Sequence, residues 1–312
     1  MKIAFVFPGQ GSQSVGMMGS YSELPSVRDT FSEATDILQQ DLWSMVSNGP
    51  EDSLNLTTNT QPVMLTADVA IYRAWQQAGG IKPHYLAGHS LGEYAALVAA
   101  GSLTFPDALK LVRFRARVMQ ETVPEGVGGM AAIVGLDDDT VASVCTEVIS
   151  TMPGISLEPA NFNAPGQVVI AGHSQAVTQA VTLAKSKGAK LAVTLPVSIP
   201  SHCSLMQPAA EKLAFLLEET TLRPPEIPVF HNADVQQHPE AASIREILAH
   251  QLYRPVRWTE TIKTIAAQGI QHVVECGPGK VLSGLNRRID KSLENIALTD
   301  TGTLLKTAET LK

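Results

Sequence analysis

The sequence predicts an α/β protein: an α/β-hydrolase-like core with a mostly parallel sheet, interrupted by a small ferredoxin-like unit. Apolar runs of strand length alternate with helical patterns over the first 120 residues and again after about residue 200. This alternation is typical of a parallel sheet covered by helices. The stretch between them follows the order βαββαβ. We therefore expect a discontinuous large domain, 1–125 with 199–312, and an inserted small domain, 126–198.

The first part of the chain provides the opening elements of the large domain. Apolar residues such as Val27, Phe31 and Ala34 recur at helical spacing, whereas the run from Ile3 to Phe7 is short and uninterrupted. The expected elements are a strand at 3–7, a helix at 26–40, a long helix within 59–79 entered through Thr60 and Pro62, a strand at 84–87, and helices at 93–100 and 107–120.

The remaining elements follow the same signals. An acidic run, Asp137 to Asp139, suits the N-terminus of a helix. In the small domain we expect strands at 129–136, 155–161, 167–171 and 190–197, with helices at 138–149 and 174–187. Beyond it we expect helices at 208–219, 240–252 and 256–268, strands at 228–231 and 270–276, and a helix after 277–280.

Composition excludes several classes of function. The net charge of −7 disfavours non-specific nucleic-acid binding, and no apolar stretch reaches the length of a membrane span. The run before Pro8 is too short for a signal-peptide core, so we expect a cytoplasmic protein with neither nucleic-acid nor membrane partners. Cys145, Cys203 and Cys276 are odd in number and far apart. They indicate neither a disulfide framework nor a zinc site, and we expect them to be buried.

The segment from Gly88 to Gly92, Gly-His-Ser-Leu-Gly, is typical of a nucleophile elbow. It lies between a strand-like run and a helical run, so Ser90 is expected on a tight strand-to-helix turn with its hydroxyl projecting from the sheet. Glycines let such a turn close without a Cβ clash. The alternative is a glycine-rich turn that carries an incidental serine.

A serine nucleophile needs a base, and His202 is the best candidate. It follows Ser90 in the chain, as the base does in this fold class, whereas His89 adjoins the serine and is expected to point elsewhere. His202 in a hydrogen-bonded structural loop is the alternative. No acid between the two residues looks like a strand-end triad member, so either a backbone carbonyl orients the histidine or this interpretation fails. Cys203 is a weaker candidate nucleophile than Ser90.

Arg115 lies on the apolar face of its predicted helix. At about 100° per residue it falls among residues such as Leu111 and Val118, while Arg113 and Arg117 face the opposite side. A buried arginine needs a partner, either a buried acid or the carboxylate of a ligand.

The loop from Pro8 to Gln13 follows the first strand. It lacks the glycine spacing and the Lys-Ser/Thr pair of phosphate-binding loops, and the Gly277–Lys280 turn lacks the earlier glycine of a P-loop. The first loop is better suited to supply the Gln10 N–H to an oxyanion, with the Leu91 N–H as the second donor.

Seven segments occur in an order that covers nearly the whole chain. They are Phe7–Gln13, Gly88–Glu93, Arg115 with Met119-Gln120, Asn161–Gln167, Pro200–His202, Gln251-Leu252 with Pro255–Trp258, and Glu275–Gly279. Together they resemble the malonyl-coenzyme A:acyl carrier protein transacylases of fatty acid synthesis. The resemblance implies an α/β-hydrolase-like core with a ferredoxin-like insert.

The resemblance also implies a role for each matched residue. These are Ser90 as the acyl-accepting nucleophile, His202 as its base, the Gln251 main-chain carbonyl as the group orienting His202, Gln10 and Leu91 as oxyanion donors, and Arg115 as the partner of the malonyl carboxylate. The implied reaction is a ping-pong exchange through a malonyl-serine ester, without a metal or redox cofactor. Its substrates would be malonyl-CoA and acyl carrier protein, and we expect a monomer.

The carrier protein is expected to be acidic, as this chain is, so docking would need local basic residues. Arg287-Arg288 and the group Lys185, Lys187 and Lys190 are our candidates. A serine esterase or thioesterase, a non-catalytic docking module and an acyltransferase of a polyketide pathway are the alternatives. Arg115 and the missing acid argue against a hydrolase, and an intact Ser90 and His202 argue against a docking module.

Overall fold

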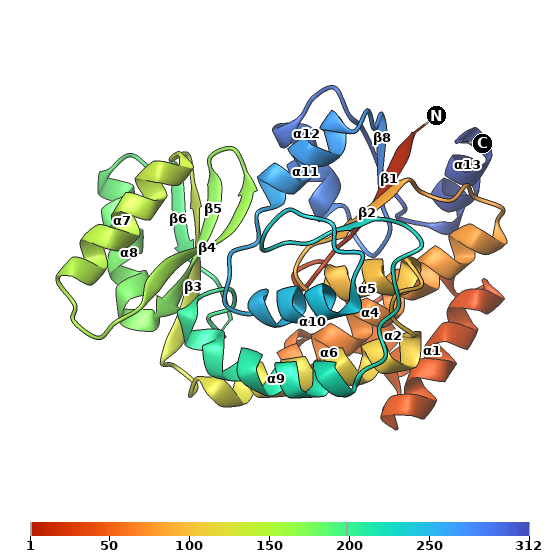
Figure 1. Ribbon diagram of the computed structural model, residues 1–312, viewed down its shortest axis with the longest axis horizontal. Helices are drawn as coiled ribbons and strands as arrows, with labels where there is room; N and C mark the ends of the chain where they lie inside the picture. The colour runs from red at the N-terminus through yellow and green to blue at the C-terminus, as the bar shows by residue number, and fades with distance from the viewer. Residues whose placement is uncertain (1, 198, 312) are drawn as a thin grey trace.

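A computed structural model describes residues 2–197 and 199–311. Two sheets lie side by side, the smaller in the green part of the chain (Figure 1). The larger sheet has the order β7-β2-β1-β8-β9 with all neighbours parallel. Its strands are β1 Ile3–Phe7, β2 Tyr85–Gly88, β7 Val229–Phe230, β8 His272–Glu275 and β9 Glu294–Ala297.

Both faces of the larger sheet are buried, as parallel sheets require. On β1, Ile3, Phe5 and Phe7 pack into the main core, whereas Ala4 and Val6 pack into a second core. The main core is completed by α1 Pro25–Leu38, α2 Leu42–Asn48, α3 Glu51–Asn55, α4 Thr57–Gln77, α5 Gly92–Ala99, α6 Phe105–Thr122, α9 Gln207–Glu219, α10 Ala241–His250 and α13 Thr301–Thr310. The second is completed by α11 Trp258–Ala267 and α12 Val281–Ile289.

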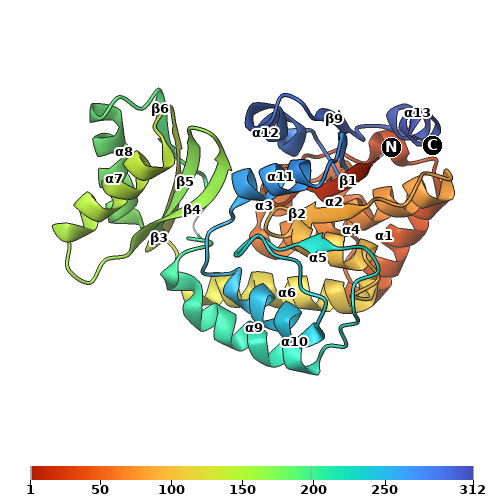
Figure 2. The same cartoon turned by 45° about the horizontal axis from the view of Figure 1, so that its top comes forward.

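The smaller sheet is antiparallel, with the order β4-β5-β3-β6. Its elements are β3 Gly128–Val134, α7 Asp138–Ser150, β4 Leu157–Ala164, β5 Gln167–His173, α8 Ser174–Ser186 and β6 Leu191–Thr194. The chain order βαββαβ with the last strand beside the first is that of a ferredoxin-like unit, which confirms the predicted fold class. Both helices cover one face of this sheet (Figure 2). The division at 126 and 198 stays a prediction, and its end, Ser198, lies outside the described residues.

The structure corrects several expected boundaries. The long helix α4 begins at Thr57, so Pro62 lies inside it and not at its entrance. The first strand of the hairpin continues to Ala164, leaving only Pro165-Gly166 as the turn. Two short helices (α2 and α3), the edge strand β9 and the helix α13 were not expected from the sequence. No helix in the described part of the chain combines the length and apolar character that a bilayer span needs.

Candidate active site

Ser90 lies on a sharp turn between β2 and α5, at the carboxyl edge of the larger sheet. Its φ is +51°, a left-handed conformation that is costly for a residue with a side chain. A Cβ on Gly88 would collide with Gly92, and a Cβ on Gly92 would collide with the carbonyl of Phe7. The two glycines therefore let the strand, the turn and the helix approach closely enough to form this elbow.

His202 reaches Ser90 from the loop that follows the small sheet. Its Nε2 lies 2.7 Å from Ser90 Oγ and its Nδ1 lies 2.7 Å from the main-chain oxygen of Gln251. A carbonyl oxygen can only accept, so Nδ1 carries the proton and Nε2 is left to accept the proton of the serine hydroxyl. Burial, followed by the charge of Arg115, lowers the pKa of His202 to about 3. The imidazole is therefore neutral at neutral pH, as a base must be.

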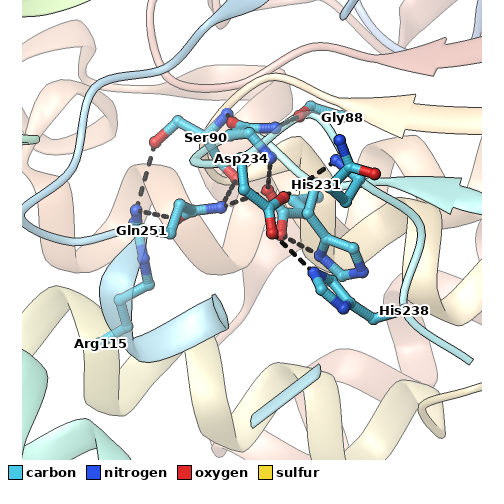
Figure 3. A network of polar contacts seen from close by, with 10 residues as sticks. Gly88, Ser90, Arg115, His231, Asp234, His238 and Gln251 are labelled. Carbon is cyan, nitrogen blue, oxygen red and sulfur yellow. Dashed lines mark hydrogen bonds and ion pairs between the residues drawn. The ribbon is translucent and has the colours of Figure 1, made fainter. Parts of the chain in front are cut away.

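Arg115 is 2% exposed and reaches the same point from α6, while Arg113 and Arg117 on this helix are exposed. The helical spacing predicted this division. The Arg115 guanidinium donates to Gln61 Oε1 (2.8 Å), Gln251 Oε1 (3.0 Å) and Ser90 Oγ (3.2 Å). Figure 3 shows Arg115 rising toward Gln251 from the helix below.

The partners of Arg115 are all neutral. Among the described residues it forms no ion pair, and its buried Nε has no hydrogen-bond partner. Its guanidinium carbon lies 5.8 Å from the centroid of the Tyr94 ring. Burial lowers the pKa of this guanidinium, which shows how poorly its charge is solvated. A buried cation beside the Ser90 hydroxyl, with donors still available, suits an anionic group on a substrate.

The first loop lies directly against the elbow. A Cβ on Gly9 would stand 2.5 Å from the carbonyl oxygen of His89 and 3.6 Å from the nitrogen of Leu91. Within residues 2–197 and 199–311, neither the N–H of Gln10 nor that of Leu91 donates a hydrogen bond. The N–H of Ser90, in contrast, is bonded to Asn232 Oδ1 at 2.6 Å. Two unused donors beside the Ser90 hydroxyl are the arrangement that an oxyanion hole requires.

The structure adds residues that the sequence analysis did not single out. Asn232, just after β7, also donates to the carbonyl of Gly88 at 2.6 Å, so its side chain binds the main chain both before and at Ser90. Glu93 is completely buried below the elbow, and Gln61 on α4 supports Arg115. The position of Asn232 at the carboxyl end of a strand was an available signal. Glu93 ends one of the seven matched segments but was given no role, and Gln61 offered only its place in a predicted helix.

Other candidates lie in different surroundings. The ring of His89 lies against that of Trp258, with 5.4 Å between the ring centroids, and its Nε2 lies 2.8 Å from Asn163 Oδ1 on β4. Cys203 is fully buried, and burial raises the pKa of its thiol to about 12, which disfavours the reactive thiolate. Asp234 and His238 form a separate pair at 2.7 Å (Figure 3). In the described chain, His, Cys, Asp and Glu side chains do not gather into a group that could hold a metal ion.

Comparison with known proteins agrees with this geometry. The family model described as an acyl transferase domain matches residues 4–304, and the chain belongs to this family. The malonyl CoA-acyl carrier protein transacylase of Salmonella typhimurium is 53% identical over 304 residues, 97% of each chain. That of Bacillus subtilis is 45% identical over 312 residues, covering 100% of this chain and 98% of the relative.

Solved structures of other proteins are also similar to this chain. The acyl-carrier-protein S-malonyltransferase from Burkholderia pseudomallei superimposes with a TM-score of 0.97 at 55% identity, covering 99% of this chain and 100% of the other. A malonyl-transacylase solved in complex with its type II PKS acyl-carrier protein gives a TM-score of 0.97 at 50% identity, with the same coverage.

Proposed function

We propose that this enzyme transfers a malonyl group from coenzyme A to the phosphopantetheine thiol of acyl carrier protein, through an ester on Ser90. The proposal rests on one observation, which is that the side chains of His202 and Arg115 both lie within hydrogen-bond distance of Ser90 Oγ. A neutral imidazole lies 2.7 Å from the serine oxygen, and a buried arginine without an acidic partner lies 3.2 Å from the same oxygen. The relatives named above act on malonyl groups, and an arginine of this kind suits a donor with a free carboxylate.

In the first half-reaction His202 Nε2 takes the proton of Ser90 as Oγ attacks the thioester carbonyl. The negative charge that develops on the carbonyl oxygen is held by the N–H groups of Gln10 and Leu91. The carbonyl of Gln251 binds the Nδ1 proton and keeps the imidazolium in place. The carbon–sulfur bond then breaks, the imidazolium returns the proton to the coenzyme A sulfur, and a malonyl-serine ester remains.

The second half-reaction runs the same chemistry in reverse with a new thiol. His202 takes the proton of the pantetheine thiol, whose sulfur attacks the ester carbonyl, and Ser90 leaves with the proton. Both halves are acyl transfers, so the proposal includes no metal and no redox cofactor. Arg115 would pair with the malonyl carboxylate throughout. An acetyl donor would leave this guanidinium buried and unpaired, at a cost of about 3 to 5 kcal/mol.

The mass of the intact protein tests the proposal. After exposure to malonyl-CoA the mass should rise by one malonyl group, and the Ser90→Ala variant should show no rise. Adding a pantetheine thiol should then return the mass to its starting value and yield malonyl-pantetheine. An unmodified parent protein would contradict the proposal, and free malonate as the main product would identify a thioesterase instead.

The proposed acceptor is a carrier protein of fatty acid synthesis. The similar structure that contains a type II PKS carrier favours a polyketide carrier as the second candidate. The ratio of kcat/KM for the two carriers decides between them. We also propose that the protein is a cytoplasmic monomer. Three buried cysteines without a disulfide are typical of a reducing compartment. Sedimentation of the purified protein tests whether it is a monomer.

A further inference from the structure

Glu93 is a buried carboxylate that has no role in the proposed reaction. It lies in the first turn of α5, three residues after Ser90, and its side chain is 0% exposed. Its oxygens accept hydrogen bonds from three donors. Oε1 faces His231 Nδ1 at 2.7 Å, and Oε2 accepts from the Asn232 N–H at 3.0 Å and from Gln251 Nε2 at 2.8 Å. The ion pairs of the described chain give it neither a lysine nor an arginine.

Two of these donors belong to residues that hold the reacting groups. The Asn232 side chain binds the N–H of Ser90 and the carbonyl of Gly88, both at 2.6 Å, and so supports the strained turn at the nucleophile. Gln251 presents its main-chain oxygen to His202 Nδ1 at 2.7 Å. Both residues are thereby tied to one oxygen of Glu93, and neither tie involves solvent.

Glu93 also decides which way the amide of Gln251 faces. Glu93 Oε2 accepts from the amide and the guanidinium of Arg115 can only donate, so the amide turns its NH₂ toward Glu93 and its oxygen toward Arg115. The opposite orientation would place two donors against each other at Arg115 and two acceptors against each other at Glu93. In Figure 3 the Gln251 side chain lies beside the end of Arg115, and its Nε2 also donates to the main-chain oxygen of Ser90 at 3.0 Å, so this choice matters for both residues.

We propose that Glu93 is the positioning residue of this active site and that it acts through Gln251 and Asn232 in place of a triad acid. It touches neither the substrate nor the reacting atoms. It fixes the carbonyl that orients His202 and the amide that holds the Ser90 backbone. The inference rests on the proposed function, because the reaction that these groups perform is the acylation of Ser90.

Two substitutions test it, with the rate of Ser90 malonylation measured in a single turnover. Glu93→Gln keeps an oxygen that can accept from both Asn232 and Gln251, and His231 can switch tautomer to face the new NH₂, so most of the rate should remain. Glu93→Ala removes both bonds and should slow malonylation by about 100-fold, the effect expected of a small misplacement of reacting groups. Equal loss in both variants, or no loss in either, would overturn the proposal.

A spectroscopic readout separates positioning from loss of stability. Nitrogen-15 NMR of histidine-labelled protein reports the Nδ1–H tautomer of His202, which the His202→Ala variant assigns. Glu93→Ala should mix the tautomers, whereas an unchanged His202 signal would count against the proposal. If Glu93→Ala does not fold, Gln251→Ala cuts the same link while keeping the carbonyl, and it should give the same mixture.

Glu275→Ala is the matched control. Glu275 is also fully buried, and it accepts from the N–H groups of Leu282 and Ser283 at 3.0 and 2.7 Å. Its loss should lower the melting temperature but leave malonylation and the His202 signal unchanged. If the parent protein stays unmodified in the mass assay, the proposed function is contradicted but the role of Glu93 is not, because the tautomer of His202 is measured without malonyl-CoA.

Discussion

His202 is held so that only one of its nitrogens is free to accept a proton. The Gln251 carbonyl requires a proton on Nδ1, while Nε2 faces the serine. Burial and the nearby charge of Arg115 both oppose a second proton on the ring. The same contacts that orient the imidazole thus keep it unprotonated, and this has a measurable effect on the pH dependence of acylation.

We expect the second-order rate of Ser90 malonylation to be flat from about pH 8 to about pH 5, because this rate reports the free enzyme. Protonation of His202 removes the acceptor, so the rate should decline only as the pH approaches the folded-state pKa of about 3. Stopped-flow or quenched-flow acylation at low malonyl-CoA measures it. An inflection near the ordinary histidine pKa of about 6.5 would contradict this prediction.

Arg115→Ala should reduce malonyl transfer by about 100-fold or more, since losing one partner of a buried ion pair costs about 3 to 5 kcal/mol. Acetyl transfer should rise relative to malonyl transfer, because an uncharged donor no longer meets an unpaired cation. Parallel assays with the two coenzyme A thioesters measure the ratio. Arg117→Ala, an exposed arginine on the same helix, is the control; equal loss for both donors would remove Arg115 from carboxylate binding.

Among the elements, the strand–turn–helix unit from β2 to α5 depends most on small residues. We expect Gly92→Ala to lower the free energy of unfolding by about 1 to 3 kcal/mol, because its methyl group would meet the Phe7 carbonyl. Acylation should fall as well, since the same displacement moves the Leu91 N–H. Gly284→Ala, on α12 with open space around it, should instead be neutral or stabilising. Chemical denaturation compares the two, and equal stability would contradict the prediction.

The sequence predicted the elements whose pattern depends on their own residues. The strand Ile3–Phe7 is confirmed residue for residue, and helical spacing correctly predicted the buried face of Arg115. The short helices α2 and α3 were missed because five to seven residues carry too little periodicity. Gln61 and Glu93 were missed for a different reason. A buried polar residue is recognisable only with its partners, and those come from distant parts of the chain.

For the molecule as a whole, the site is supported by both sheets. His89, next to Ser90, is hydrogen-bonded to Asn163 on β4 of the small sheet. Glu158 on the same strand accepts hydrogen bonds from Ser204, two residues beyond His202. The small sheet therefore holds the neighbours of both Ser90 and His202, although it contributes neither residue.

The basic residues expected to meet a carrier protein differ in their surroundings. Arg288 contacts Gln167 and the carbonyl of Pro165 at the hairpin turn, and Lys187 is paired with Glu147 at 2.8 Å. We expect Arg288→Glu to lower kcat/KM for an acidic carrier protein, with an effect that salt weakens, because the proposed attraction is electrostatic. Lys187→Glu is the paired comparison. Unchanged use of the carrier by both variants would refute this docking surface, and transfer to free pantetheine should be unaffected.

The burial of all three cysteines has a practical consequence for following such transfers. Their thiol pKa values are raised, to about 12 for Cys145 and Cys203, so hardly any thiolate is present at neutral pH. A sulfur-directed alkylating agent should therefore spare the enzyme and react with the exposed thiols of the mixture, which are those of released coenzyme A and of unacylated carrier protein. If a reaction is quenched with such a reagent, the mass of the carrier protein then reports the fraction that was not acylated, without separation of the enzyme from the acceptor.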